Sequence, residues 1–407
     1  MAGEVPDLNQ LGHRAPRDVT MRLRHEVARL LQRDSTSFPG AQPVSFSKHH
    51  IQDNLLQQDY YVCEKSDGLR CLMYLTAERN QDQHEEQAVY MITRKNEYFY
   101  INDIYFPRAN DIKEFNRDCL IDGELVFSKS PETGKSEIKY LMFDCLAAGF
   151  NTLLVDRFYD KRLAYLKSFI YEPFKRLCTD YPEDTIVFPF KATMKHMDFS
   201  YGLQQVFDVL QPKLGHISDG LIFTCRTSPY VSGTDRNILK WKPSEENSVD
   251  FLLTLDIPVY QPDGFVNYDT KPRFQLNVWY GGDSNKPFGE LYLTDDEWET
   301  IKALNEPVDE RVVECYKDKE DRWRYLRFRD DKTNGNHIST VESVLISIDN
   351  PVTKDDLLDA VPIIRKNWKL RDHERQLKHQ QHQQHQQKQQ GVLKRPIEGN
   401  EMPPRKK

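Results

Sequence analysis

The chain has 407 residues, of which 29% are charged and 38% hydrophobic, and its formal net charge is −7. This length exceeds one typical domain and predicts two or three. The acidic balance argues against a uniformly basic nucleic-acid binder, although an acidic protein can carry a local basic cleft. No apolar run has the length of a membrane span and the N-terminus lacks a signal-type apolar segment, so we expect no membrane partner.

The seven cysteines are an odd number without a CxxC pair, and they lie scattered, often inside apolar segments. Disulfide frameworks need paired cysteines, and structural zinc sites need closely spaced ligands. We therefore predict reduced core thiols of an intracellular protein, and no zinc site.

The first part of the chain alternates strand-like and helical segments. Residues 19–32 carry apolar side chains at near-helical spacing and predict a packing helix, and residues 38–46 form a loop with two prolines. Strands are predicted at 60–75, 89–101, 120–127, 140–145, 220–226 and 237–242, and helices at 157–180 and 197–210. The pattern predicts an α+β domain with a mostly antiparallel sheet system.

A second domain is predicted beyond a polar junction at residues 243–247. Five short strands predict a small barrel, for which an OB-fold is the natural candidate. Thr294 and Glu297 form a capping box for a helix at 295–304, and a further helix at 354–368 is expected to pack back on the first domain. The five strands are predicted at 249–257, 274–280, 289–293, 311–317 and 323–329.

The composition changes at residue 371, after which Gln and His dominate up to residue 390. Such a tract cannot bury a core, so we predict a disordered, solvated tail rather than a histidine metal site. Basic clusters at 394–395 and 405–407 favour a bipartite nuclear import signal over a plain basic end. The predicted division is 1–242, 243–370 and a tail of 371–407.

The segment Lys-Ser-Asp-Gly-Leu-Arg at 65–70 directly follows the apolar run at 60–63. A lysine at a strand end can act as a nucleophile, and Gly68 would let the backbone turn tightly beside a ligand. Arg70 could fix a ribose or phosphate with its planar fork of donors. The plainer alternative is an exposed hairpin, because Asp-Gly is a common turn pair.

Five more motifs follow this one in order: DGEL at 122–125, YLMFDCL at 140–146, SDGLIF at 218–223, LKWK at 239–242 and FRDDKTNGNH at 328–337. Together they resemble the covalent nucleotidyltransferases, which include mRNA guanylyltransferases and ATP- or NAD-dependent polynucleotide ligases. The last motif and the segment FPGAQPVSF at 38–46 resemble single-function fungal capping guanylyltransferases rather than ligases. The implied fold is an antiparallel-sheet nucleotidyltransferase domain of ATP-grasp or ligase-like type plus an OB-fold barrel.

The resemblance implies that Lys65 attacks the α-phosphate of GTP and forms a lysyl–GMP adduct. Lys65 must lose a proton to react, and partial burial beside Arg70, Lys240, Lys242 and a metal would lower its pKa. Lys240 and Lys242 lie two residues apart on a predicted strand, so they share one face and Trp241 takes the other.

The remaining site residues are also implied by the resemblance. Phe143 would stack on guanine, although an aromatic inside a strand is more simply a core residue. Glu124 and Asp219 would meet Mg²⁺ or Mn²⁺ or, for Glu124, the ribose; both could instead be ordinary turn carboxylates. The other implied nucleotide contacts are Arg94 at the ribose, Lys191 at guanine, Asp250 at the start of the second domain, and Arg329, Asp331 and Lys332 at the β- and γ-phosphates.

The implied product is a GpppN cap on 5′-diphosphate RNA, held mainly through phosphate contacts. No HCxxxxxR phosphatase loop precedes the lysine motif, so a separate RNA 5′-triphosphatase subunit is an expected partner. The phosphorylated C-terminal domain of RNA polymerase II is a second partner, and the nucleus is the expected location. The alternatives are an ATP-dependent polynucleotide ligase and an inactive scaffold that binds RNA or the polymerase tail.

Overall fold

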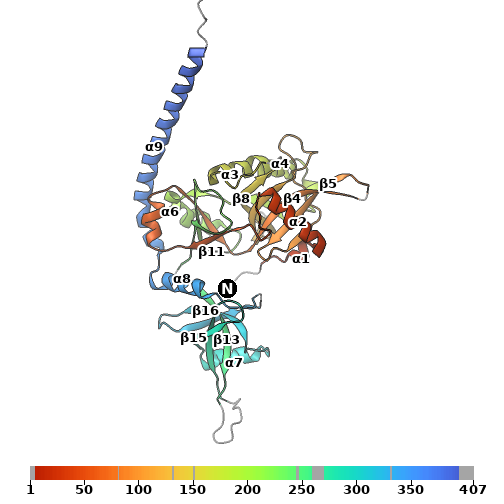
Figure 1. Ribbon diagram of the computed structural model, residues 1–407. Coiled ribbons are helices and arrows are strands. Elements are labelled where there is room, and N and C mark those ends of the chain that lie inside the picture. The colour runs from red at the N-terminus through yellow and green to blue at the C-terminus, as the bar shows by residue number, and fades with distance from the viewer. Residues whose placement is uncertain are drawn as a thin grey trace, which may run out of the picture.

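The computed structural model describes residues 5–80, 82–130, 133–149, 152–243, 247–258, 270–330 and 332–393, without the side chains of 382–393. A larger α/β body stands above a small β-barrel, with helix α8 between them, and helix α9 runs up beside the larger body (Figure 1). Within the described residues, no helix is both long and apolar enough to cross a membrane.

The larger body contains two sheets. The seven-stranded sheet has the order β1 (Gly12–Arg14), β6 (Tyr98–Ile101), β5 (Glu85–Thr93), β4 (Leu69–Arg79), β7 (Cys119–Lys129), β8 (Ser136–Ala148) and β9 (Lys191–Met194). The five-stranded sheet has the order β10 (Asp198–Phe199), β3 (Tyr60–Ser66), β11 (Ser218–Cys225), β12 (Gly233–Trp241) and β2 (Ala41–Ser45). Pairing is antiparallel except for β8 with β9 and β12 with β2, as the sequence predicted.

The lysine motif joins these two sheets. Strand β3 pairs with β10 and β11, whereas β4 pairs with β5 and β7, so the chain crosses between sheets at Asp67 and Gly68. The hairpin alternative for this motif is therefore wrong. Gly68 is required by close packing rather than by a ligand, because a Cβ there would overlap the carbonyl oxygen of Leu125.

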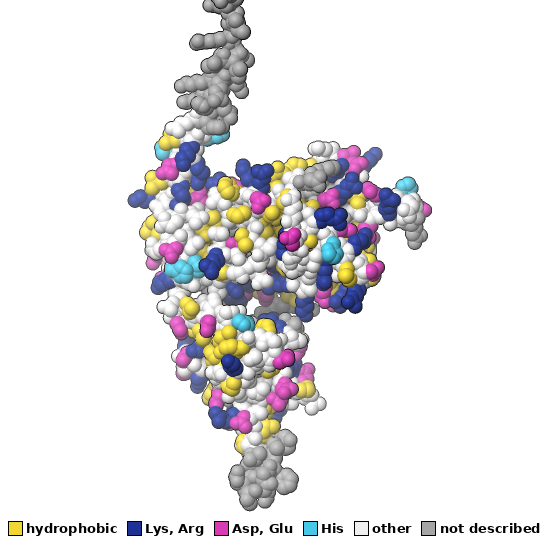
Figure 2. Space-filling view, in the orientation of Figure 1, with side chains coloured by type: hydrophobic (Ala, Val, Ile, Leu, Met, Phe, Trp, Pro, Cys, Tyr) yellow, Lys and Arg dark blue, Asp and Glu magenta, His cyan; other side chains and the backbone are white. Residues whose placement is uncertain are grey.

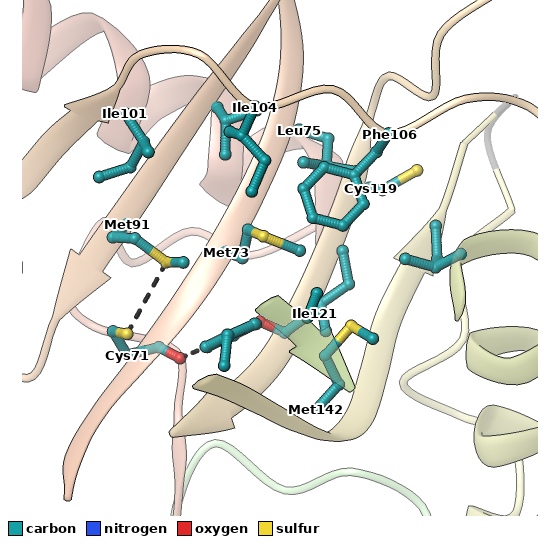
Figure 3. Close-up of a cluster of buried hydrophobic side chains, with 14 of the residues drawn as sticks. Cys71, Met73, Leu75, Met91, Ile101, Ile104, Phe106, Cys119, Ile121 and Met142 are labelled. Carbon is teal, nitrogen blue, oxygen red and sulfur yellow. Dashed lines mark hydrogen bonds between the residues drawn. The ribbon is translucent and has the colours of Figure 1, made fainter. Parts of the chain in front are cut away.

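Both faces of the seven-stranded sheet are covered. Alternate residues of β4 point to opposite faces, so Cys71, Met73 and Leu75 enter one core while Leu72 and Tyr74 enter another. The first core lies under the helical segment that follows β8, and Figure 3 shows its sulfur-containing and aliphatic side chains meeting. The second core is closed by α2 (Arg17–Leu30), the helix predicted at 19–32.

All seven cysteines are free, and six of them are buried. Burial raises the pKa of the Cys63 thiol to about 12. The prediction of unpaired core thiols is confirmed for these six, whereas Cys178 is half-buried.

The barrel is closed and has the strand order β13 (Ser248–Asp256), β14 (Arg273–Trp279), β15 (Asn285–Tyr292), β17 (Trp323–Phe328) and β16 (Arg311–Lys317). Each of the five predicted strands is present. Helix α7 (Asp295–Ala303) begins with the predicted capping box, in which Thr294 and Glu297 bond reciprocally.

The remaining helical segments connect the sheets or close the ends of the body. The α-helices are α1 (Leu8–Leu11), α3 (Tyr159–Tyr165), α4 (Glu172–Asp180), α5 (Pro182–Thr185), α6 (Leu203–Gln205), α8 (Ile338–Asp349) and α9 (Lys354–Leu393). Short 3₁₀ and π turns are η1 (Ile51–Leu55), η2 (Leu166–Tyr171), η3 (Ser200–Gly202), η4 (Val206–Leu210) and η5 (Gln211–Lys213).

Helix α9 corrects one prediction and confirms another. Its first turns pack back on the larger body, as expected, with Leu357, Ala360 and Ile364 in the core of the five-stranded sheet. The prediction of a disordered tail from residue 371 is wrong for residues 371–393, which continue the helix. Gln and Lys are good helix formers, and Arg371 is anchored by a 2.8 Å bond to Asp59, so the helix does not need a core of its own.

Candidate functional site

A cavity of about 460 Å³ lies where the two sheets of the larger body face the barrel. Figure 2 shows the surface hollowed at this level, between the larger body and the barrel. The cavity brings together residues that lie far apart in the sequence. Of the predicted site residues, those that line it are Lys65, Arg70, Arg94, Glu124, Phe143, Lys240, Lys242, Asp250, Arg329 and Lys332.

Lys65 is held at the end of β3 by a carboxylate from the neighbouring strand. Its Nζ donates a 2.6 Å hydrogen bond to Asp219 Oδ1, and Lys242 Nζ lies 2.7 Å from Asp219 Oδ2. A register shift between Ser218 and Leu221 turns Asp219 out of the regular pairing of β11. Asp219 therefore bridges Lys65, the predicted nucleophile, and Lys242, a predicted nucleotide-binding residue.

The two lysines of the LKWK motif share a face, as the strand periodicity predicted. Lys240 and Lys242 line the cavity, while Trp241 packs into the core of the five-stranded sheet and borders the cavity only in part. Burial opposes ionisation of Asp219, yet Lys242 and Lys65 hold its pKa below the ordinary value. Burial, and after it the charges of Lys242 and Lys65, lower the pKa of Lys240.

Arg70 is committed to the protein rather than presented to a ligand. Its Nε and Nη2 donate to the two oxygens of Asp122 at 3.0 and 2.6 Å, and its Nη1 donates to the carbonyl of Ala41. Tyr230 also donates to Asp122. The expectation that Arg70 offers its fork to a ribose or phosphate is not met, because Asp122, two residues before Glu124 on β7, takes that fork.

Arg94 is a second arginine in the cavity, and unlike Arg70 it is not bonded to a carboxylate in the part of the chain that the structure describes. It follows β5, and no hydrogen bond or ion pair is recorded for it among the described residues. Burial, followed by the charge of Arg70, lowers its pKa. A desolvated guanidinium without a protein anion is suited to a charged or polar ligand.

Phe143 lines the cavity instead of filling a core. The Arg70 guanidinium and the Lys195 ammonium each lie 5.6 Å from the centroid of its ring. Glu124 accepts a hydrogen bond from Ser66, the residue after Lys65. The aromatic face and this carboxylate therefore lie near the start of the lysine motif.

The prediction for Lys191 is wrong. Its side chain is 71% exposed, forms a 2.7 Å ion pair with Glu137 on the outer surface, and does not line the cavity. Lys195 lines the cavity instead: its side chain is 3% exposed and its Nζ donates to Ser66 Oγ at 2.6 Å. Strand β9 ends at Met194 and the Lys195 amide bonds to the Met142 carbonyl, which carries Lys195 beside Phe143.

The barrel contributes its own charged group to the cavity. Asp250 on β13 is buried and accepts from Arg329 at 3.2 Å, from Lys332, and from Asn336 at 3.3 Å. The Asn336 amide also bonds to the Asp250 carbonyl at 2.6 Å. The FRDDKTNGNH motif is thereby fastened to β13, while Asp331 lies outside the described residues.

Side chains for a metal ion are present only in part. The described residues contain no group of three His, Cys, Asp or Glu side chains that could hold one. Asp219 and Glu124 offer the oxygen ligands that Mg²⁺ and Mn²⁺ prefer, but Asp219 is paired with lysines and Glu124 with Ser66. Protein carboxylates would thus supply part of a coordination shell, and phosphate oxygens the rest.

Two family models match consecutive parts of the chain. Residues 6–244 match the catalytic domain of mRNA capping enzymes, and residues 246–358 match their C-terminal domain. The chain belongs to the mRNA capping enzyme family. The predicted class, an mRNA guanylyltransferase, is confirmed by this membership, and the resemblance drawn from six short motifs was correct.

Full-length relatives support the same conclusion. The mRNA-capping enzyme subunit alpha of Yarrowia lipolytica is 52% identical over 375 residues, covering 91% of this chain and 94% of the relative. The proteins of the same name from Neurospora crassa and Saccharomyces cerevisiae are 46% and 41% identical, over 92% and 91% of this chain and 96% and 88% of theirs. The similarity therefore extends over both domains of this capping enzyme.

Proposed function

We propose that this capping enzyme transfers GMP from GTP to the 5′-diphosphate end of RNA, with Lys65 as the nucleophile. The observation that carries the proposal is the pairing of Lys65 with Asp219, which fixes one ammonium group at the wall of a cavity rich in cations. Lys242 on the second oxygen of Asp219 limits how far that carboxylate can move.

The first step forms a bond from Lys65 Nζ to the α-phosphorus and breaks the bond from that phosphorus to the α,β-bridging oxygen. Lys65 gives up a proton beforehand, and pyrophosphate leaves with the electron pair. Lys240 and Arg94 supply positive charge where negative charge develops on the phosphate. In the second step, a terminal phosphate oxygen of the RNA attacks the same phosphorus, and Lys65 leaves and regains its proton.

The nucleoside would occupy the end of the cavity near Phe143. Its ring face suits a purine, Lys195 takes the guanine-reading role predicted for Lys191, and Glu124 would bind the ribose or a metal-bound water. Mg²⁺ or Mn²⁺, held by Asp219 and Glu124 together with phosphate oxygens, would neutralise charge on the leaving pyrophosphate.

The barrel would complete the site for the first step. Arg329, Asp331 and Lys332 are proposed to meet the β- and γ-phosphates when the barrel closes over the cavity, and opening would admit RNA. We assign the barrel as an OB-fold, since its closed five-strand order and the helix between β15 and β16 fit that class. The proposed division is a nucleotidyltransferase domain over 1–242 and a barrel domain over 243–370.

A separate RNA 5′-triphosphatase subunit would supply the diphosphate end. The name of the relatives, subunit alpha, supports a second subunit. The phosphorylated C-terminal domain of RNA polymerase II and a nuclear location are proposed with it, because capping acts on nascent mRNA.

The test is incubation of the protein with α-labelled GTP or ATP and a divalent metal, followed by denaturing electrophoresis and a chase with 5′-diphosphate RNA. We expect acid-labile label from GTP alone, absent in Lys65→Ala, which then moves to RNA. Label from ATP would make the protein ligase-like. Absence of label from folded protein with either nucleotide would overturn the proposal in favour of a scaffold.

A further inference from the structure

Glu64 lies next to the proposed nucleophile but points away from it. On β3, Lys65 and Glu64 are consecutive, so their side chains leave opposite faces of the strand. The Glu64 carboxylate is buried, with 9% of its side chain exposed, and its Oε1 lies 3.9 Å from Lys195 Nζ. None of the proposed catalytic steps uses this carboxylate.

Lys195 lies between two carboxylates. Its Nζ is 3.9 Å from Glu64 and 3.7 Å from Glu124, and it donates to Ser66 Oγ. Burial of the ammonium would by itself lower the pKa of Lys195, but Cys63, followed by Glu64 and Glu124, holds it above the ordinary value. A fully buried lysine stays charged only with such partners.

A second buried side chain, His216, also lies beside Glu64. Its Nε2 lies 3.4 Å from Glu64 Oε1, its side chain is 8% exposed, and it stands in the segment just before β11. The Asp67 amide bonds to the Ile217 carbonyl at 3.0 Å, which ties the same segment to the lysine motif. His216 and Lys195 thus both approach Oε1 of Glu64, and His216 Nε2 forms no hydrogen bond with the described residues.

We propose that Glu64 is a positioning residue for guanine selection: its buried carboxylate, 3.9 Å from Lys195 Nζ, helps to fix the Lys195 ammonium beside the ring of Phe143. This inference rests on the proposed function, since it concerns the nucleobase end of the GTP site. The role cannot pass to Glu124 alone, because Glu124 is also bonded to Ser66 and faces the cavity that the nucleotide would enter. Removing Glu64 leaves Lys195 with one anionic neighbour that a ligand can engage.

The experiment measures KM and kcat for adduct formation by Glu64→Gln with GTP and with ATP. We expect KM for GTP to rise about tenfold with kcat little changed, because one partner of a buried charge is lost. The preference for GTP over ATP should narrow.

Glu137→Gln is the matched control, since Glu137 also pairs with lysines but lies outside the cavity. Lys195→Gln completes a double-mutant cycle, and adding Glu64→Gln to it should have no further effect on KM. Glu64→Asp, which keeps the carboxylate, should restore most of the affinity for GTP and keeps the test decisive even if Glu64→Gln folds poorly.

Equal KM values and equal GTP-over-ATP preferences for Glu64→Gln and Glu137→Gln, or fully additive effects in the cycle, would overturn the inference. Failure of the proposed function is a separate result, because the wild-type protein itself would then take no label from GTP.

Discussion

Among single residues, Lys240 is a cation that the fold desolvates and surrounds with like charges. Burial, Lys242, Lys65 and Arg94 all lower its pKa, and only Asp219 opposes them. A buried charge in this environment destabilises the folded state, and such strain is retained where a site must bind an anion. The Lys240 charge that would bind an anion therefore also lowers the stability of the folded state.

We expect Lys240→Gln to raise the free energy of unfolding by about 1 kcal/mol and to impair adduct formation. Because the pKa of Lys240 is lower in the folded state than in the unfolded state, this increase in the free energy of unfolding should be fully present at neutral pH. It should shrink as pH rises from that lowered pKa towards the pKa of an ordinary lysine. Urea unfolding at several pH values measures this, and a destabilised variant would contradict it. Lys242→Gln is the contrast, since Lys242 is paired with Asp219 and its loss should not stabilise.

Gly68 carries a steric demand at the crossing between the sheets. We expect Gly68→Ala to lower the free energy of unfolding by about 1–3 kcal/mol, because a Cβ would overlap the carbonyl of Leu125. Gly289→Ala is the control, since a Cβ there would meet Trp323 at an ordinary 3.5 Å. Thermal unfolding of both variants measures the difference. Equal melting temperatures would contradict the steric demand at Gly68.

The residue types and the order of the sequence motifs predicted many of the charged and aromatic residues that line the cavity. Lys65, Arg94, Phe143 and the two lysines of LKWK were found because each adjoins a strand within a recognisable motif. Lys195 was missed because it lies four residues beyond Lys191, in a segment with no distinguishing pattern of its own. Only the end of β9 and its bond to Met142 determine which lysine turns inward.

At the scale of elements, strand prediction succeeded where apolar runs were bounded by turn residues, and it failed to assign strands to sheets. Residues 60–75 appear continuous, yet β3 and β4 belong to different sheets. Helix α8 was not predicted, although His337 caps its first turn. It has a short apolar face whose partners come from the barrel and are distant in sequence. Sheet membership and such packing depend on tertiary contacts that local patterns do not encode.

Helix α9 is part of the core of the larger body despite following the barrel in sequence. Trp241 Nε1 donates to the Val352 carbonyl at 2.7 Å, and the buried Asp59 pairs with Arg371 and Arg375 at 2.8 and 2.7 Å. Its apolar residues lie in the same cluster as strands β3, β11 and β12. The helix therefore fastens the five-stranded sheet.

Truncation after residue 353 should lower the free energy of unfolding by about 5 kcal/mol, because it removes three buried side chains from that core. A protein truncated after residue 380 keeps those side chains and both arginine pairs, so its free energy of unfolding should equal that of the full chain. Urea titration of the two proteins provides the measurement. Equal stability of both would show that α9 is dispensable.

For the whole molecule, the barrel is connected to the larger body at two points. The chain leaves after β12 and returns between α8 and α9, so the barrel is an insertion between β12 and the helix that completes the larger body. Its cations lie across the cavity from Lys65 and are gathered by Asp250. The groups that contact Lys65, the proposed nucleophile, therefore belong to the larger body, whereas the groups that would meet the leaving pyrophosphate belong to the barrel.

Lys332→Gln should therefore slow adduct formation about a hundredfold while leaving transfer from a preformed adduct to RNA unchanged. Pyrophosphate is present only in the first step, so only that step needs this cation. Single-turnover kinetics with isolated adduct separates the two steps. A parallel loss in both would show that Lys332 acts on the RNA step as well.

The central claim is that Lys65, among the several lysines of the cavity, forms the bond to GMP. The direct measurement is proteolysis of the GTP-labelled protein and mapping of the modified lysine by tandem mass spectrometry. The account predicts GMP on Lys65 alone. GMP on Lys240, Lys242 or Lys195 would contradict it, because those side chains are assigned to binding and not to attack.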